Sequence, residues 1–112
     1  MGERFKTNSA VQLFLIREKN GKTEILLQKR KNCWAEGMWD SSASGHVEQG
    51  EPMTASLHRE ALEEIGIEIN RDNIAFINMQ HSNLEGLSYY NGYFFVKDFS
   101  GVPTIHEHDK CC

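Results

Sequence analysis

The stretch from Gly45 to Ile67 constrains this chain more than any other part of it. It reads GHVEQGEPMTASLHREALEEIGI, and its carboxylates at Glu60, Glu63 and Glu64 are spaced i, i+3 and i+4. A helix presents residues at these spacings on one face, where like charges repel one another unless a cation lies between them. Mg²⁺ suits such a face, because it prefers carboxylate and water oxygens and often shares them with substrate phosphates.

A solvated, charged helix surface is the plainer explanation of the segment REALEE by itself, since surface helices are routinely charged. The residues around that segment argue against the plainer explanation. Glu51 follows Gly45 by six positions, Arg59 follows Glu51 by eight, and Gly66 comes two positions after Glu64. Together these spacings favour a functional loop and helix over a solvated surface.

The whole pattern resembles the signature of the Nudix hydrolase family, Gx5Ex7REUxEExGU, in which U is a bulky aliphatic residue. Every fixed position matches, and the matching residues are Gly45, Glu51, Arg59, Glu60, Glu63, Glu64 and Gly66. Ile67 fits the last U position, whereas Ala61 is smaller than the consensus. The resemblance implies a Nudix-type α/β/α sandwich with a mixed β-sheet, in which residues 1–112 form one domain around a signature at 45–67.

The resemblance also implies the residues that bind metal and activate water. The ligands of Mg²⁺, with Mn²⁺ as the alternative ion, would be Glu60, Glu63 and Glu64, helped by the backbone carbonyl of Gly45. Members of the family differ in their general base. Glu63 or Glu64 would serve here, and Glu107 in the late loop is the third candidate, although a solvated role for Glu107 is at least as plausible.

Four further residues take structural or phosphate-binding roles, Gly66 by its place after the expected helix and the others by the same resemblance. Arg59 would pair with Glu51 to hold the loop against the helix, and Gly66 would cap the helix C-terminus. Arg30, near the end of an expected strand, would face the substrate phosphates. A solvated strand end is an equally good explanation of the basic trio that contains Arg30.

Hydrolysis of a nucleoside diphosphate linked to another group is the activity that this family implies, and two alternatives remain open. Residues 39–47 also resemble a stretch of isopentenyl diphosphate isomerases, but those enzymes use a cysteine beside it, and Cys33 lies well upstream. The second alternative is a Nudix-like module that senses a nucleotide without cleaving it. The family's usual Pro-Gly-Gly corresponds here to Ala43-Ser44-Gly45, and the missing Pro and first Gly leave the substrate class open.

The rest of the chain predicts a sheet and one helix. An amphipathic helix is expected over 52–65, with Leu57, Ala61, Leu62 and Ile65 as its buried stripe. Asn20-Gly21 predicts a tight hairpin, and a break or bulge is expected near Asn91-Gly92. An aromatic-rich strand is more often core than a base-stacking surface, and Trp39 could also be core. Strands are expected at 10–17, 24–30, 74–80 and 87–97.

Charge and composition limit the classes of partner that the chain is expected to bind. The net charge is −4, with eight Lys/Arg against three Asp/Glu in residues 1–33 and four against thirteen in residues 34–112. This argues against a nucleic-acid polymer and fits a small nucleotide or other diphosphate substrate. No apolar run reaches the length of a membrane span, and three cysteines without metal-ligand spacing indicate reduced thiols in the cytoplasm. The family's last strand and helix are expected to be missing, in a natural variant or a truncated chain. In a truncated chain, exposed apolar surface predicts poor stability or self-association, as in a homodimer.

Overall fold

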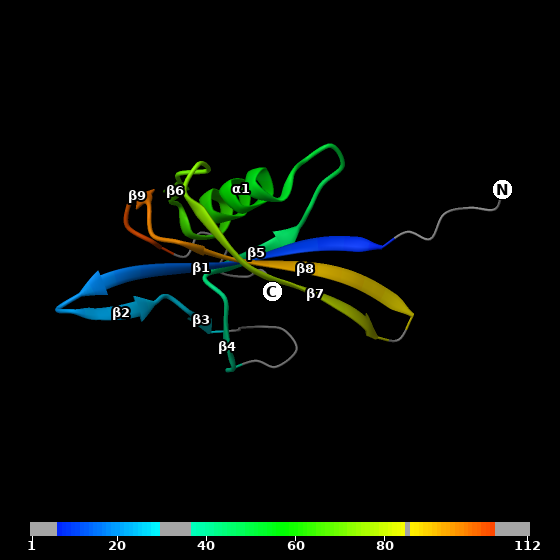
Figure 1. Ribbon diagram of the computed structural model, residues 1–112, viewed down its shortest axis with the longest axis horizontal. Coiled ribbons are helices and arrows are strands. Elements are labelled where there is room, and N and C mark those ends of the chain that lie inside the picture. Colours follow the sequence, from blue (N-terminus) through cyan, green and yellow to red (C-terminus); the bar gives the residue numbers. More distant parts are fainter. Residues whose placement is uncertain (1–6, 30–36, 85, 105–112) are drawn as a thin grey trace.

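A computed structural model describes residues 7–29, 37–84 and 86–104 of the chain. Its longer strands are β1 (Asn8–Lys19), β2 (Lys22–Ile25), β5 (Ala43–His46), β7 (Ile74–Leu84) and β8 (Leu87–Val96). Its two-residue strands are β3 (Gln28–Lys29), β4 (Trp39–Asp40), β6 (Glu68–Ile69) and β9 (Phe99–Ser100). The helix is α1 (Met53–Ile65), which lies over the sheet in Figure 1.

The sheet is assembled around β1, which is 12 residues long. It pairs in parallel with β8 and antiparallel with β2 and β5, and β8 pairs antiparallel with β7, so the sheet is mixed as expected. β5 and β2 follow one another along the same edge of β1, because β5 pairs with residues 10–13 and β2 with residues 16–19. The outer edge of β5 therefore lies beside α1, and residues of β5 contact the helix.

The turn between β1 and β2 confirms the hairpin expected at Asn20-Gly21. Both residues have positive φ, 53° at Asn20 and 77° at Gly21. Two successive left-handed residues match the right-handed twist of the flanking strands, and asparagine followed by glycine adopts them with little strain. The hairpin returns β2 along β1, with Ile16 opposite Ile25.

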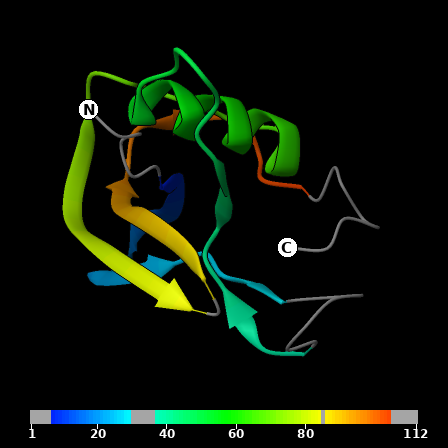
Figure 2. The ribbon, with the colours of Figure 1, turned by 90° about the vertical axis from the view of Figure 1, so that its right-hand side faces the viewer.

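The hydrophobic core lies between α1 and one face of the sheet, as Figure 2 shows. Successive strand residues point to opposite faces, so Val11 and Leu13 of β1 face the helix, where they pack with Leu57 and Ala61. Gln12, between Val11 and Leu13, belongs to the opposite face. The two faces of β1 therefore serve different purposes, one for packing and one for surface chemistry.

α1 begins after Pro52 and ends at Gly66, whose φ of 69° is left-handed and whose N–H bonds to the carbonyl of Leu62 at 3.1 Å. This confirms the expected helix and its glycine cap. The expected buried stripe is wrong at Leu62, which is 44% exposed. Ser56 and Glu60 are buried on the other side of the stripe, because the helix is rotated about its axis to face β5 and the loop before it.

Two expectations about the strands are corrected. The strand expected at 24–30 is divided, since β2 ends at Ile25 and β3 pairs with β4 instead of β1. β8 is continuous through Asn91-Gly92. The shift of register is in β7, between Phe76 and Asn78, which pair with Phe94 and Tyr93 of β8. Gly92 serves close packing, because a Cβ there would lie 2.9 Å from the sulfur of Met53.

The aromatic residues are less buried than expected. Phe94 is in the core at 6% exposed, but Tyr90 is 38% exposed and Tyr89 is half-buried. Trp39 is 66% exposed and lies under the Lys29 ammonium group, 5.9 Å from the ring centroid. Period-two alternation explains Tyr89, which lies on the face of β8 away from α1. Tyr90 shares the face of Phe94 and stacks instead with His81, at 4.3 Å between ring centroids. No helix among the described residues has the length and apolar character needed to cross a membrane.

Candidate active site

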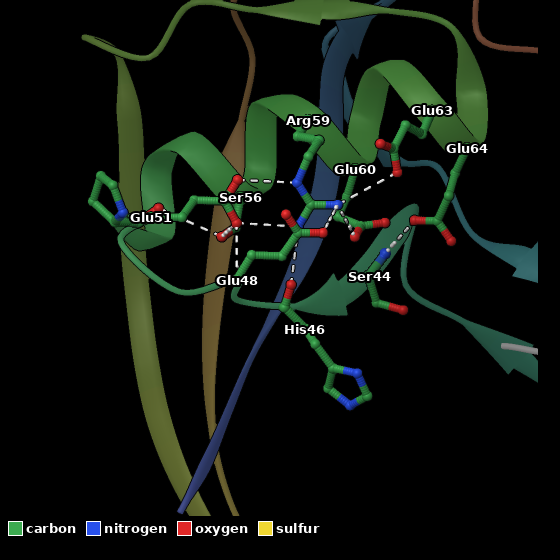
Figure 3. Close-up of polar contacts among 10 residues, drawn as sticks. Ser44, His46, Glu48, Glu51, Ser56, Arg59, Glu60, Glu63 and Glu64 are labelled. Atoms are coloured by element: carbon green, nitrogen blue, oxygen red, sulfur yellow. Dashed lines mark hydrogen bonds and ion pairs between the residues drawn. The ribbon is translucent and has the colours of Figure 1, made fainter.

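Arg59 on α1 holds the loop that follows β5. Its Nε and Nη2 donate to the two carboxylate oxygens of Glu51, at 2.9 Å and 3.1 Å. Nη2 also donates to the backbone carbonyl of His46 at 3.0 Å. Glu51 additionally accepts hydrogen bonds from the Ser56 hydroxyl and the Glu48 N–H. Figure 3 shows these contacts, which join the end of β5, the loop and the first turns of α1.

The contacts fix the charge of both partners. The pKa of Glu51 falls from 4.5 to about 2, first because Arg59 donates to its carboxylate, and then because Ser56 and the Glu48 N–H do so. The pKa of Arg59 is raised above its ordinary value, chiefly by its hydrogen bond to Glu51. The two parallel hydrogen bonds between Arg59 and Glu51 also fix the geometry of the loop, because a bidentate pair holds both groups in one orientation.

The three glutamates at helical spacing lie along the same side of α1. Glu60 is 5% exposed, and its Oε1 accepts from Nη1 of Arg59 at 2.8 Å. Glu63 is more exposed and accepts from the same nitrogen at 3.4 Å. Glu64 accepts from the backbone N–H of Ser44 in β5 at 2.8 Å. The helix therefore presents all three carboxylates to the edge of β5.

Gly45 occupies a position that only glycine fits without rearrangement. A Cβ built on it would lie 2.2 Å from both Cδ and Oε1 of Glu60. The backbone of β5 therefore approaches the Glu60 carboxylate as closely as it can, which places the peptide group of Gly45 next to the acidic side of α1. This close approach explains why a glycine is needed here, although the backbone of Gly45 is not left-handed.

The carboxylates as placed are turned toward protein donors. Among the residues that the structure describes, no three side chains of His, Cys, Asp or Glu are grouped to hold a metal ion together. Glu60 and Glu63 share Arg59, and Glu64 is directed to Ser44. A cation at this site would compete with Arg59 for the oxygens of Glu60 and Glu63.

These residues line a cleft of about 680 Å³, a volume within the range of small-molecule sites. The cleft extends around the edge of β5, so it is acidic on the helix side and largely uncharged on the sheet side. Its helix side includes Glu48, Arg59, Glu60, Glu63 and Glu64. The other lining residues are Ala10, Gln12, Asp40, Ser44, Gly45, His46, Tyr89 and Asn91.

Two predicted site residues, Arg30 and Glu107, lie outside the described part of the chain. Other residues of the site were not predicted. Glu48, 3.7 Å from Nη1 of Arg59, and Ser56 belong to no fixed position of the signature. Ser56 precedes Glu60 by one helical turn, and that spacing was the available signal. The sheet side of the cleft depends on strand register, which the sequence does not specify.

A family model described as the NUDIX domain matches residues 6–111. The chain belongs to the Nudix family. Its signature coincides with the loop, helix and glycine described above, and the mixed sheet with α1 is the arrangement of Nudix structures.

Solved structures support the fold class. The MutT NUDIX hydrolase of Burkholderia pseudomallei has a TM-score of 0.78 and 25% identity, over 96% of this chain and 79% of that one. The E. coli ORF135 protein has a TM-score of 0.74 and 30% identity, over 94% and 71% of the two chains. The expected Nudix-type α/β/α fold class with a mixed sheet is thereby confirmed.

A curated relative matches over a shorter stretch. Nudix hydrolase 3 of Arabidopsis thaliana is 38% identical over 52 residues, which are 44% of this chain and 7% of that protein. A C. elegans Ap4A hydrolase structure, at 24% identity and a TM-score of 0.62, covers 82% of this chain and 68% of its own and shares the fold.

Proposed function

We propose that this Nudix protein is a hydrolase that cleaves the pyrophosphate bond of a nucleoside diphosphate linked to another group. The observation that carries the proposal is the bidentate pair of Arg59 and Glu51, which holds the loop against α1. That contact brings Gly45 and the glutamates of α1 to one cleft. The hydrolase names of the MutT relative and of the Arabidopsis relative support the same activity.

The donor set fits a hard divalent cation, and Mg²⁺ is the ion that we propose. Glu60, Glu63 and Glu64 would hold it with the carbonyl of Gly45, since carboxylate and carbonyl oxygens are the ligands it prefers. The missing Cβ at Gly45 supports this, because a methyl group there would fill the space beside the Glu60 carboxylate. When bound, such an ion offsets phosphate charge and lowers the pKa of bound water.

Residues of α1 would orient the metal ligands and accept a proton from the attacking water. Arg59 keeps Glu60 oriented through Nη1 while the rest of its guanidinium group holds Glu51. Glu63 or Glu64 would accept the proton of the attacking water, and both lie on the acidic side of the cleft. Substituting each of the two in turn distinguishes them.

The test is a panel of nucleoside triphosphates, nucleotide sugars and dinucleoside polyphosphates, incubated with Mg²⁺ or with a chelator. We expect Mg²⁺-dependent release of a nucleoside monophosphate, lost in Glu64→Gln or Glu63→Gln. Glu68→Gln is the matched control, because Glu68 is an exposed carboxylate on β6 outside the cleft. A folded wild-type protein that binds nucleotides but cleaves none of the panel would contradict the proposal and support a sensing module.

Three further predictions accompany this function. We infer that the substrate is a small nucleotide and not a nucleic-acid polymer, that the location is the cytoplasm, and that the protein self-associates as a homodimer. Each follows from the sequence pattern. Sedimentation of the purified protein and fractionation of cells that express it would test the assembly and the location.

A further inference from the structure

The sheet side of the cleft has a composition unlike its helix side. β5 pairs with β1 and β1 pairs with β8, and the register places His46, Ala10 and Asn91 in one row across the three strands. Residues directly opposite one another in a ladder share a face of the sheet, and this face is the one that α1 does not cover. In Figure 3 the His46 side chain points away from α1.

Ala10 forms the floor between two larger side chains. It is 7% exposed at the centre of the row, whereas the cleft reaches Asn91 on one side and His46 on the other. Ala10 itself also lines the cleft, so a small side chain separates the two larger ones there. Tyr89, two residues before Asn91 and on the same face, stacks with His46 at 5.7 Å between ring centroids and 21° between ring planes. The floor therefore has an aromatic pair at one end.

Two carboxamides adjoin the floor. Gln12, one step along β1 from Ala10 on this face, accepts a hydrogen bond at its Oε1 from the Ser41 hydroxyl at 2.8 Å. The other end of the same carboxamide is left for a ligand. Within residues 7–29, 37–84 and 86–104, the carboxamide of Asn91 has no hydrogen-bond partner, although it lines the cleft. A carboxamide offers an adjacent donor and acceptor, which suits the edge of a nucleobase.

We propose that the base of the substrate nucleoside lies on this sheet face, against Ala10 and beside the His46–Tyr89 pair, with the carboxamides of Asn91 and Gln12 binding its edge. The inference rests on the proposed function and assigns the nucleoside to named residues. An uncharged base occupies the side without the glutamate cluster, and the phosphates extend over the edge of β5 toward α1. Stacking and amide contacts together suit an aromatic base better than an aliphatic group.

The experiment uses uncharged nucleosides, so neither metal nor turnover is needed. Adenosine, inosine, cytidine, uridine and free ribose are titrated into ¹⁵N-labelled protein, and ¹H–¹⁵N spectra follow the backbone signals and the side-chain NH₂ signals of Gln12 and Asn91. We expect at least one nucleoside to shift these signals and those of residues 10 and 89, while ribose leaves them unmoved.

Two variants and a matched control sharpen the test. Asn91→Ala removes an amide contact, and Ala10→Val places two methyl groups on the floor without disfavouring the strand. Each should raise the nucleoside Kd about fivefold or more, the loss that follows removal of one hydrogen bond or of close packing. Ala75→Val makes the same change at an exposed position of β7 outside the cleft and should leave the Kd unchanged.

The outcomes separate this inference from the proposed function. Shifts confined to another surface, shifts of equal size with ribose, or no shift up to the solubility of each nucleoside would overturn the inference even if the protein hydrolyses nucleotides. Nucleoside binding here by a protein that cleaves no nucleotide would support the base site and contradict the hydrolase.

Discussion

Replacing Gly45 with alanine tests the close approach between β5 and α1. The new Cβ would lie 2.2 Å from Cδ and Oε1 of Glu60 and 2.7 Å from Oε2, so the carboxylate has to retreat by about 1 Å or more to reach ordinary contact distance. Glu60 is 5% exposed and its Oε1 is 2.8 Å from Nη1 of Arg59, so retreat strains or breaks that bond.

The expected cost is that of overpacking combined with a weakened charged hydrogen bond. Overpacking alone costs about 1–3 kcal/mol, and net loss of a hydrogen bond to a charged group costs about as much, though the two overlap. We expect Gly45→Ala to reduce the free energy of unfolding by about 2 kcal/mol and the Tm by about 10 °C. Ser44→Ala is the control, because the contact from Ser44 to Glu64 uses the backbone N–H.

The assay is thermal unfolding followed by circular dichroism, with Glu60→Ala added to complete a double-mutant cycle. Removing the Glu60 carboxylate removes the clash, so Gly45→Ala should be almost neutral in that background. A coupling energy of about 1 kcal/mol or more is expected. Additive effects within about 0.5 kcal/mol would refute the reasoning, because they would show that the Gly45 methyl group does not meet Glu60.

Three other predictions concern the clamp and the helix. Glu51→Gln should lower the free energy of unfolding above pH 4.5, because it removes the stability that comes from the depressed carboxyl pKa of Glu51. The wild type should lose that stability as the pH falls toward about 2, whereas the variant should show no corresponding loss. Urea unfolding across this pH range measures both free energies. Leu57→Ala should cost about 2–5 kcal/mol in urea unfolding, because Leu57 is fully buried, whereas Leu62→Ala should cost about 0.5 kcal/mol or less. Gly66→Ala should cost about 1–2 kcal/mol, because its φ is 69°, and an unchanged Tm would contradict that.

The sequence predicted the helix and its neighbourhood well, because local rules govern them. Helical spacing, a proline before the first turn and a left-handed glycine after the last are read within a few residues, and they predicted α1 and its Gly66 cap. The rotation of α1 is not a local property. Leu62 is exposed and Glu60 is buried because α1 packs against β5, and apolar periodicity contains no information about that contact.

The sheet side of the cleft was beyond prediction for a different reason. Ala10, His46 and Asn91 come together through the register of two strand pairs that are far apart in sequence. Register depends on which face of each strand is buried, and here the choice is made by packing against α1. The irregularity expected at Asn91-Gly92 is found in β7 instead, and Gly92 serves close packing with Met53.

The measurement that tests the central claim most directly is kcat for a responsive nucleotide with Mg²⁺, compared between the wild type, Glu63→Gln, Glu64→Gln and Glu68→Gln. Glutamine keeps the shape of each side chain and removes its charge. The account predicts that at least one of the two α1 variants loses about 100-fold or more, as expected for loss of a general base or metal ligand, while Glu68→Gln matches the wild type. Activity in both α1 variants equal to that of the wild type would contradict it.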